Sequence, residues 1–268
     1  MRKVLTIAGS DCSGGAGIQA DLKTMCAMGV YGMSVITAVT VQNTRAVYDV
    51  QEISPEIVGK QIDAIFEDIP VDAVKIGMVS NASIIRMIRD KLVQNSAKHI
   101  VVDPVMVSKS GYHLLRPEAV AAMSELIAIA DIVTPNIPEA ELLTGSVISS
   151  REDMARAARE IGGMGAKAVL VKGGHRTDDA SDVLWTSRNT ELYMGERIDT
   201  QNTHGTGCTL SAAIASQLAL GRSTEAAVAA AKQYISQAIK DAFPVGGGVG
   251  PVGHLVQLYR QAGIRIEE

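Results

Sequence analysis

The 268-residue chain combines 47% hydrophobic with 20% charged residues and carries a formal net charge of −4. This composition suits a protein that buries a large core, and its interspersed charges form no basic stripe of the kind that binds nucleic acid. No apolar stretch is long enough to span a bilayer, and the first residues lack the make-up of a signal peptide. The three cysteines, Cys12, Cys26 and Cys208, form neither a disulfide framework nor a zinc pattern, so we expect a cytoplasmic protein.

Short aliphatic runs alternate with amphipathic segments along most of the chain. The runs predict buried strands at residues 4–8, 35–41, 73–76, 100–102, 132–133 and 168–171. The amphipathic segments predict helices at residues 18–28, 56–67, 84–93, 117–129 and 152–164. This rhythm indicates an α/β fold of three layers, in which helices cover both faces of a central, mostly parallel sheet. Ligands of such folds bind at the carboxyl ends of the strands.

The last third of the chain continues with different patterns. Two short strands at 181–185 and 191–193 predict a hairpin that extends the sheet. Two alanine-rich helices are predicted at 206–220 and 223–242, and a glycine cluster at 246–250 precedes a final helix. No linker, repeat or low-complexity tract divides the sequence, so residues 1–268 are expected to form one domain.

The segment 202–211, NTHGTGCTLS, combines a glycine turn with the start of a helix. Gly205 and Gly207 allow a tight turn, and the helix is expected to begin near Thr206. Its free backbone N–H groups would converge on one point, with the helix dipole behind them, and could stabilise the charge of a transferring phosphoryl group. Cys208 falls in the first helical turn, where the pKa of a thiol is usually lowered. An ordinary glycine turn with a small core cysteine is the structural alternative.

Three other segments place polar residues after strands. Residues 8–21 are interpreted as the end of a strand, a glycine-rich loop and the first turn of a helix that carries Asp21, but no Gly-Lys-Ser/Thr closes the loop as in a P-loop. Asn136 can cap a helix, and Glu139 can either complete that cap or hold water molecules of a magnesium ion bound to ATP. Lys172 ends a strand and precedes two glycines that would let a nucleotide approach. Taken singly, Asp21 and Lys172 also fit solvated surface positions.

Seven motifs occur along the chain in one order. They are TIAGSD at 6–11, GGAGIQADLKT at 14–24, QNT at 42–44, KIGM at 75–78, DPVM at 103–106, TPN at 134–136 and NTHGTGC at 202–208. Together they resemble the ribokinase-like superfamily and, within it, the phosphomethylpyrimidine kinase family of thiamine biosynthesis. The resemblance implies a ribokinase-like fold that uses ATP and Mg²⁺ to phosphorylate 4-amino-5-hydroxymethyl-2-methylpyrimidine and then its monophosphate. Relatives of this kind are often homodimers, and we expect the same here.

The resemblance also implies roles for individual residues. Asp21 and Gln42 would bind the polar edge of the pyrimidine, between walls formed by Gly9, Met78 and Val105. Lys172 and Asn136 would contact the nucleotide, Glu139 would organise magnesium, and Gly205, Thr206, Gly207 and Cys208 would form the anion hole. Sugar kinases of this fold carry Asp where Cys208 stands. An unperturbed thiol, with a pKa of about 8.5, is mostly protonated at neutral pH, so whether Cys208 is a general base stays open.

Three other functions compete with this prediction. A pyridoxine or pyridoxal kinase would use the same phosphate machinery, but the amide of Gln42 offers both a donor and an acceptor to an aminopyrimidine edge. A metabolite sensor without catalysis would be expected to lose the anion turn, Lys172 or Glu139. A nucleotide-dependent dehydrogenase disagrees with the glycine spacing of the first loop.

In addition, residues 106–113 are predicted to act as a flap that excludes water.

Overall fold

One continuous sheet runs through the protein, for which a computed structural model describes residues 1–106, 119–174 and 179–265. Its order is β3-β2-β1-β4-β5-β6-β7-β8-β9. The strands are β1 (Lys3–Asp11), β2 (Tyr31–Gln42), β3 (Val47–Glu52), β4 (Ala73–Ile76), β5 (Ile100–Val102), β6 (Ile132–Val133), β7 (Ala168–Val171), β8 (Asp182–Thr186) and β9 (Thr190–Tyr193). From β2 to β7 the neighbours are parallel, whereas β3 at one edge and the hairpin β8–β9 at the other pair antiparallel.

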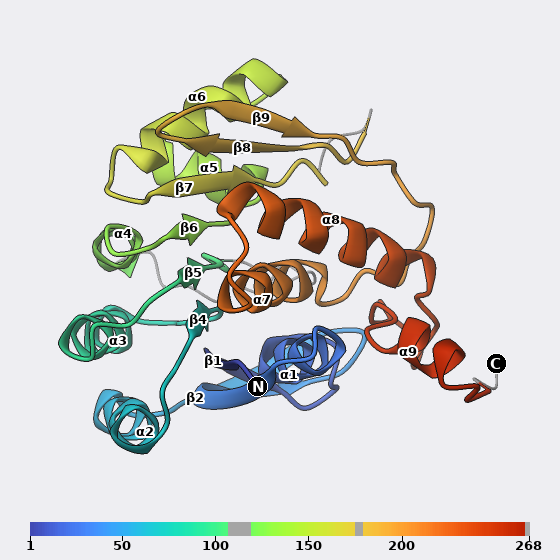
Figure 1. The fold of residues 1–268 in the computed structure, drawn as a ribbon, viewed down its shortest axis with the longest axis horizontal. Helices are drawn as coiled ribbons and strands as arrows, with labels where there is room; N and C mark the ends of the chain where they lie inside the picture. The colour runs from blue at the N-terminus through green and yellow to red at the C-terminus, as the bar shows by residue number, and fades with distance from the viewer. Residues whose placement is uncertain (107–118, 175–178, 266–268) are drawn as a thin grey trace.

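Helices cover both faces of this sheet (Figure 1). One face carries α1 (Gly17–Ala27), α7 (Thr206–Ala219) and α8 (Thr224–Lys240), and the other carries α2 (Pro55–Asp68), α3 (Ala82–Gln94), α4 (Val120–Ile127), α5 (Ile137–Thr144) and α6 (Arg151–Gly162). The short α9 (Val256–Gln261) follows α8. Each face has its own apolar core, because successive strand side chains point to opposite sides: Leu5 packs with α2 and α3, and Val4 packs with α7 and α8. The predicted three-layer α/β fold is confirmed.

The chain changes direction across the sheet after β1. Strand β1 pairs with β2 on one side and with β4, which comes later in the chain, on the other side. In open α/β sheets such a switch leaves a crevice beside the carboxyl ends of the two strands, where ligands bind. Gly9 of β1 and Met78, which follows β4, lie at this point.

Several elements differ in their bounds from the sequence prediction, and β2 begins at Tyr31, four residues before the predicted strand. Strand β1 continues beyond residue 8, because Ser10 and Asp11 pair with β2 after an irregularity in register. Strand β3 was not predicted: most of its side chains are at least partly exposed, so it lacks a hydrophobic pattern and forms by pairing with β2. The helix predicted at 117–129 is described as Val120–Ile127. Apart from Met106, the predicted flap lies outside the described residues.

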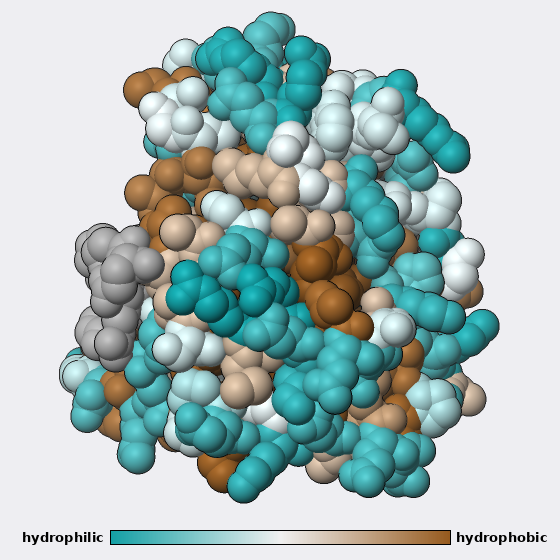
Figure 2. Space-filling view, turned by 90° about the vertical axis from the view of Figure 1, so that its left-hand side faces the viewer, coloured by the Kyte–Doolittle hydropathy of each residue, from teal (hydrophilic) through white to brown (hydrophobic). Residues whose placement is uncertain are grey.

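The outer surface over α2, α3 and α4 mixes hydrophilic and apolar side chains (Figure 2). Ion pairs link neighbouring helices there: Arg86 of α3 lies 3.1 Å from Glu125 of α4, and Lys91 of α3 lies 2.6 Å from Asp63 of α2. In the described part of the chain, no helix combines the length and the apolar character that crossing a bilayer requires.

Candidate active site

The predicted site residues gather along one edge of the sheet. Because the central strands are parallel, their carboxyl ends meet there. Gln42 ends β2 and Gly9 lies two residues before the end of β1. Met78, Val105, Asn136 and Lys172 follow β4, β5, β6 and β7. The structure therefore brings together segments that are far apart in the sequence.

The predicted glycine turn forms the start of α7. Gly205 is the N-cap residue, with φ 78° and ψ 8°, a left-handed conformation that favours glycine. No side chain of the described chain caps this helix, and although the Thr206 N–H donates to the Thr203 carbonyl at 3.3 Å, the following N–H groups of the first turn point the same way toward an anion site. A Cβ atom on Gly205 would overlap the carbonyl oxygen of Gly15, and one on Gly207 would lie 3.3 Å from Nζ of Lys172. The turn thus packs between the first loop and a lysine ammonium group.

Lys172 belongs to a buried charge network. Its Nζ lies 2.8 Å from Oδ1 of Asp103, whose other oxygen accepts a hydrogen bond of 3.2 Å from Ser211. Burial raises the pKa of Asp103, but the charges of Lys172 and Lys75 and these hydrogen bonds outweigh it and leave the pKa below its usual value. Lys172 also forms an isolated parallel bridge with Asn136. The two residues predicted to bind nucleotide are therefore neighbours.

Asn136 and Glu139 form a capping box at the start of α5. Oδ1 of Asn136 accepts a hydrogen bond of 2.9 Å from the Glu139 N–H, and Oε2 of Glu139 accepts one of 2.8 Å from the Asn136 N–H. Burial raises the pKa of Glu139 to about 7, against the opposing charge of Lys172. Within the described ranges, no group of three or more His, Cys, Asp or Glu side chains could hold a metal ion.

Cys208 is partly buried in the first turn of α7. Burial raises the pKa of its thiol to about 11, and Asp21 and Asp103 add to this effect, while Lys75 and a hydrogen bond from the Gly17 backbone oppose it. The sequence suggested a lowered pKa from the helix end, but the loss of hydration is larger. The thiol is protonated at neutral pH.

A fully buried ion pair between Lys75 and Asp21 lies close enough to Cys208 to affect the pKa of its thiol. Nζ of Lys75 is 2.9 and 2.8 Å from the two carboxylate oxygens of Asp21, and Thr6 donates a hydrogen bond of 2.6 Å to one of them. Burial lowers the pKa of Lys75, but Asp21, Cys208 and Asp103 raise it above its usual range. The sequence alone indicated no role for Lys75, although a lysine within the aliphatic strand 73–76 is an unusual feature.

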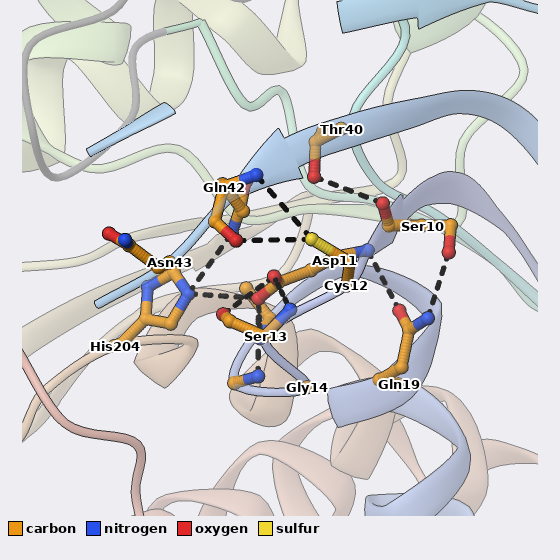
Figure 3. A network of polar contacts seen from close by, with 12 residues as sticks. Ser10, Asp11, Cys12, Ser13, Gly14, Gln19, Thr40, Gln42, Asn43 and His204 are labelled. Atoms are coloured by element: carbon orange, nitrogen blue, oxygen red, sulfur yellow. Dashed lines mark hydrogen bonds and ion pairs between the residues drawn. The ribbon is translucent and has the colours of Figure 1, made fainter. Parts of the chain in front are cut away.

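The other end of the site contains the residues expected to touch the acceptor. A Cβ atom on Gly9 would lie 3.0 Å from Sδ of Met78, so these two predicted wall residues are in contact. The amide of Gln42 lies 3.4 Å from Nε2 of His204, which in turn contacts Asp11 (Figure 3). Val105 is half-buried. Asp11 and His204 lie in the first and the last of the seven motifs, but the sequence alone indicated no function for either.

Comparisons with known proteins identify the family of the chain. The family described as phosphomethylpyrimidine kinase matches residues 11–253. The chain belongs to this family. It is therefore a phosphotransferase, and the resemblance found in its motifs is confirmed.

Its relatives and structural neighbours include two kinds of vitamin kinase. The chain is 54% identical over 255 residues to the hydroxymethylpyrimidine/phosphomethylpyrimidine kinase of Rhizobium meliloti, covering 93% of this chain and 96% of that protein. It is 50% identical over 255 residues (94% of this chain) to the thiamine biosynthesis bifunctional protein ThiED of Geobacter sulfurreducens, of which it spans 52%. The crystal structure of phosphomethylpyrimidine kinase from Clostridium difficile is 52% identical, with a TM-score of 0.81 over 89% of this chain and 100% of that one. An ADP complex of Bacillus subtilis pyridoxal kinase is 40% identical, with a TM-score of 0.90 over 96% and 99%.

Proposed function

We propose that this enzyme transfers the γ-phosphoryl group of ATP to 4-amino-5-hydroxymethyl-2-methylpyrimidine and then to its monophosphate, in thiamine biosynthesis. The observation that carries the proposal is the uncapped glycine turn at the start of α7, which lies against the Lys172 ammonium group at the carboxyl edge of the sheet. Backbone N–H groups and a fixed cation at one point suit the charge that develops on a transferring phosphoryl group. The named activities of the relatives supply the acceptor.

The nucleotide is assigned to the side of the site that carries Lys172 and Asn136. Lys172 would exchange its contact with Asp103 for a phosphate oxygen, and Glu139 would help to hold Mg²⁺ bound to the same phosphates. Magnesium would neutralise phosphate charge there, and an oxygen ligand is the kind that this ion prefers. The Glu139 carboxylate accepts backbone hydrogen bonds from Asn136 and Met106, and its remaining lone pairs would face the ion or its water.

The acceptor is assigned to the side that carries Gly9, Gln42, Met78 and Val105. Its hydroxyl oxygen would attack the γ-phosphorus while the bond to the bridging oxygen breaks and ADP leaves. Because the transition state is loose, the hydroxyl proton can leave late, to an oxygen of the transferred group. Cys208 would then lie beside the hydroxyl as a neutral thiol. Asp21 is fully buried with both oxygens bonded, so direct contact with the acceptor would require a shift of Lys75 or Thr6.

The test measures ADP formation with each acceptor in turn. With the hydroxymethylpyrimidine we expect two ADP for each acceptor consumed, and with its monophosphate one. If neither compound causes ATP turnover, a sensor is favoured. If only one ADP is released for each hydroxymethylpyrimidine, the enzyme catalyses the first step alone.

Pyridoxal kinase is the second candidate, because the pyridoxal kinase of Bacillus subtilis shares the fold over nearly the whole chain. Gln42 argues for the pyrimidine, since its amide can both donate to and accept from an aminopyrimidine edge. Comparison of kcat/KM for the two acceptors decides between them. A large preference for pyridoxal would overturn the assignment.

We further propose that the enzyme is a homodimer. Apolar side chains are exposed on the edge hairpin β2–β3, where Val41 and Tyr48 are 54% and 60% exposed and Val39 is 43% exposed. Surfaces of this kind often mark protein contacts. Light scattering after size exclusion should give twice the mass of the chain, and Val41→Glu should reduce it to one. A monomeric unmodified protein would contradict the proposal.

We also propose that residues 1–268 act as one domain in the cytoplasm and bind no nucleic acid. Strands from both halves of the sequence share one sheet, which supports a single unit. All three cysteines are free thiols, as suits a reducing compartment. The net charge of −4 disfavours a polyanionic partner.

A further inference from the structure

A network of polar contacts joins the first loop to the segment before α7 (Figure 3). Asp11 is 3% exposed and accepts hydrogen bonds on both carboxylate oxygens. Oδ1 accepts from the N–H and the hydroxyl of Ser13, and Oδ2 accepts from the N–H groups of Gly15 and Ala16. Nε2 of His204 is also 2.9 Å from Oδ2. The carboxylate is thus surrounded by donors.

These contacts determine the tautomer of His204. Burial raises the pKa of Asp11, but its hydrogen bonds from His204, Ser13 and Ala16 lower it well below its usual range, so Asp11 is ionised. An ionised carboxylate only accepts hydrogen bonds, and therefore Nε2 of His204 must carry a hydrogen and donate it. His204 is also held in place. Its backbone N–H donates to the Gly250 carbonyl at 2.9 Å, and its ring packs so closely on Gly15 that a Cβ atom there would overlap the edge of the ring.

The same imidazole nitrogen faces Gln42, whose Nε2 lies 3.4 Å away. A protonated ring nitrogen has no lone pair to accept a hydrogen from the amide NH₂ group, so two donors meet at this point. A half-turn about the last side-chain bond of Gln42 exchanges its nitrogen and oxygen. The oxygen then becomes a second acceptor for the N–H that Nε2 donates to Asp11, a bifurcated contact, and the conflict between two donors is removed. The backbone of Gln42 is held meanwhile by the Cys12 thiol, which donates to its carbonyl at 3.0 Å.

We propose that Asp11 and His204 are positioning residues that set the direction of the Gln42 amide and so determine which heterocycle edge it accepts. With its oxygen toward His204, Gln42 presents its NH₂ group to the ligand. The second lone pair of the oxygen stays available beside it. That donor–acceptor pair complements a ring nitrogen next to an exocyclic amino group, as in an aminopyrimidine. The inference rests on the proposed placement of the acceptor against Gln42.

The tautomer can be tested without any substrate. In protein with ¹⁵N-labelled histidine, we expect the ring of His204 to be protonated at Nε2, whether or not a ligand is bound. In protein with ¹⁵N-labelled glutamine, the side-chain NH₂ signal of Gln42 should shift in His204→Asn. An Nε2 without hydrogen at neutral pH, or an unchanged Gln42 signal, would overturn the proposal even if the proposed reaction proved wrong.

Two amide substitutions of His204 test its effect on specificity. Asn places its amide near Nδ1 and removes any group at Nε2, whereas Gln can reach the position of Nε2 and donate to Asp11. Loss of one hydrogen-bonded arrangement should lower kcat/KM for the hydroxymethylpyrimidine by about 3- to 10-fold in His204→Asn, mainly through KM. His204→Gln should recover part of this loss. The KM for ATP and the kcat/KM for pyridoxal should change much less, and the exposed His99→Asn serves as the matched control.

A double-mutant cycle separates positioning from general support of the fold. If His204 acts through Gln42, then His204→Asn should hardly change the ratio of the two acceptors once Gln42→Ala is present. An equal loss in both backgrounds, or an equal loss for both acceptors, would refute the role. If the unmodified enzyme phosphorylates neither acceptor, the proposed function fails instead, and the NMR measurements still decide the tautomer.

Discussion

Asp11 and Asp21 come from one short stretch of the chain and are both buried, yet they are stabilised in different ways. Asp11 accepts hydrogen bonds from the backbone of its own loop, joined by His204. Asp21 is paired with Lys75 from a strand across the core. The first carboxylate receives most of its donors once the loop folds, whereas the second gains its counter-charge only when the sheet assembles. Local amides therefore shape the end of the site proposed for the acceptor, and a long-range ion pair supports the region around Cys208.

The strongest test of this difference removes the charge of each carboxylate. Asp21→Asn should lower the free energy of unfolding by about 3–5 kcal/mol, because it leaves the Lys75 ammonium group buried without a counter-charge. Asp11→Asn should lower it by about 1–3 kcal/mol, the typical effect of unsatisfied hydrogen bonds. Urea denaturation measures both. Adding Lys75→Met to Asp21→Asn should restore most of the loss; if it does not, charge burial is not the cause.

The second test concerns the contact between the first loop and the anion turn. In Gly205→Ala the new methyl group would overlap the Gly15 carbonyl, in addition to the unfavourable φ of 78°. A displacement of the turn by about 1 Å should lower kcat by roughly 100-fold. Gly221→Ala is the matched control, because its φ is 88° but nothing lies within 4 Å of the added atom. Gly221→Ala should lower the free energy of unfolding by about 1 kcal/mol and leave kcat unchanged. Equal effects on kcat would contradict the packing argument.

Glu139 combines the two kinds of stabilisation seen at Asp11 and Asp21. Its carboxylate bonds a backbone N–H and also interacts with the charge of Lys172. Its pKa of about 7 means that lowering the pH through 7 adds a proton and removes the anionic ligand proposed for magnesium. The KM for Mg-ATP should therefore rise below pH 7, approaching about tenfold per pH unit. In Glu139→Gln the KM should be higher and independent of pH over this range. A pH-independent KM in the unmodified enzyme would remove Glu139 from the metal site.

The smallest effect is expected at Cys208, which lies near the Asp21–Lys75 pair. Because its pKa is about 11, the thiol does not titrate between pH 6 and 9, and the kcat profile should show no inflection that disappears in Cys208→Ser. Cys208→Ala should retain kcat within about tenfold if the thiol is not a base. A loss of several orders of magnitude in the alanine variant, with normal folding, would assign Cys208 a direct catalytic role.

The sequence by itself determined the elements that depend on neighbours along the chain. The aliphatic runs predicted the buried strands, Gly205 and the alanine-rich run predicted the turn and α7, and Asn136 with Glu139 predicted the helix cap. Local sterics and short-range hydrogen bonds decide such features. The motif order also indicated the family, which the comparisons then showed.

Only the tertiary structure decided which polar groups meet. His204 reaches Asp11 from a distant part of the chain, Lys75 pairs with Asp21 across the core, and β3 exists because β2 offers an edge to pair with. The pKa of Cys208 depends on burial, which no local pattern reveals. Electrostatic effects depend on distance and hydration in the folded protein, and the sequence lists neither.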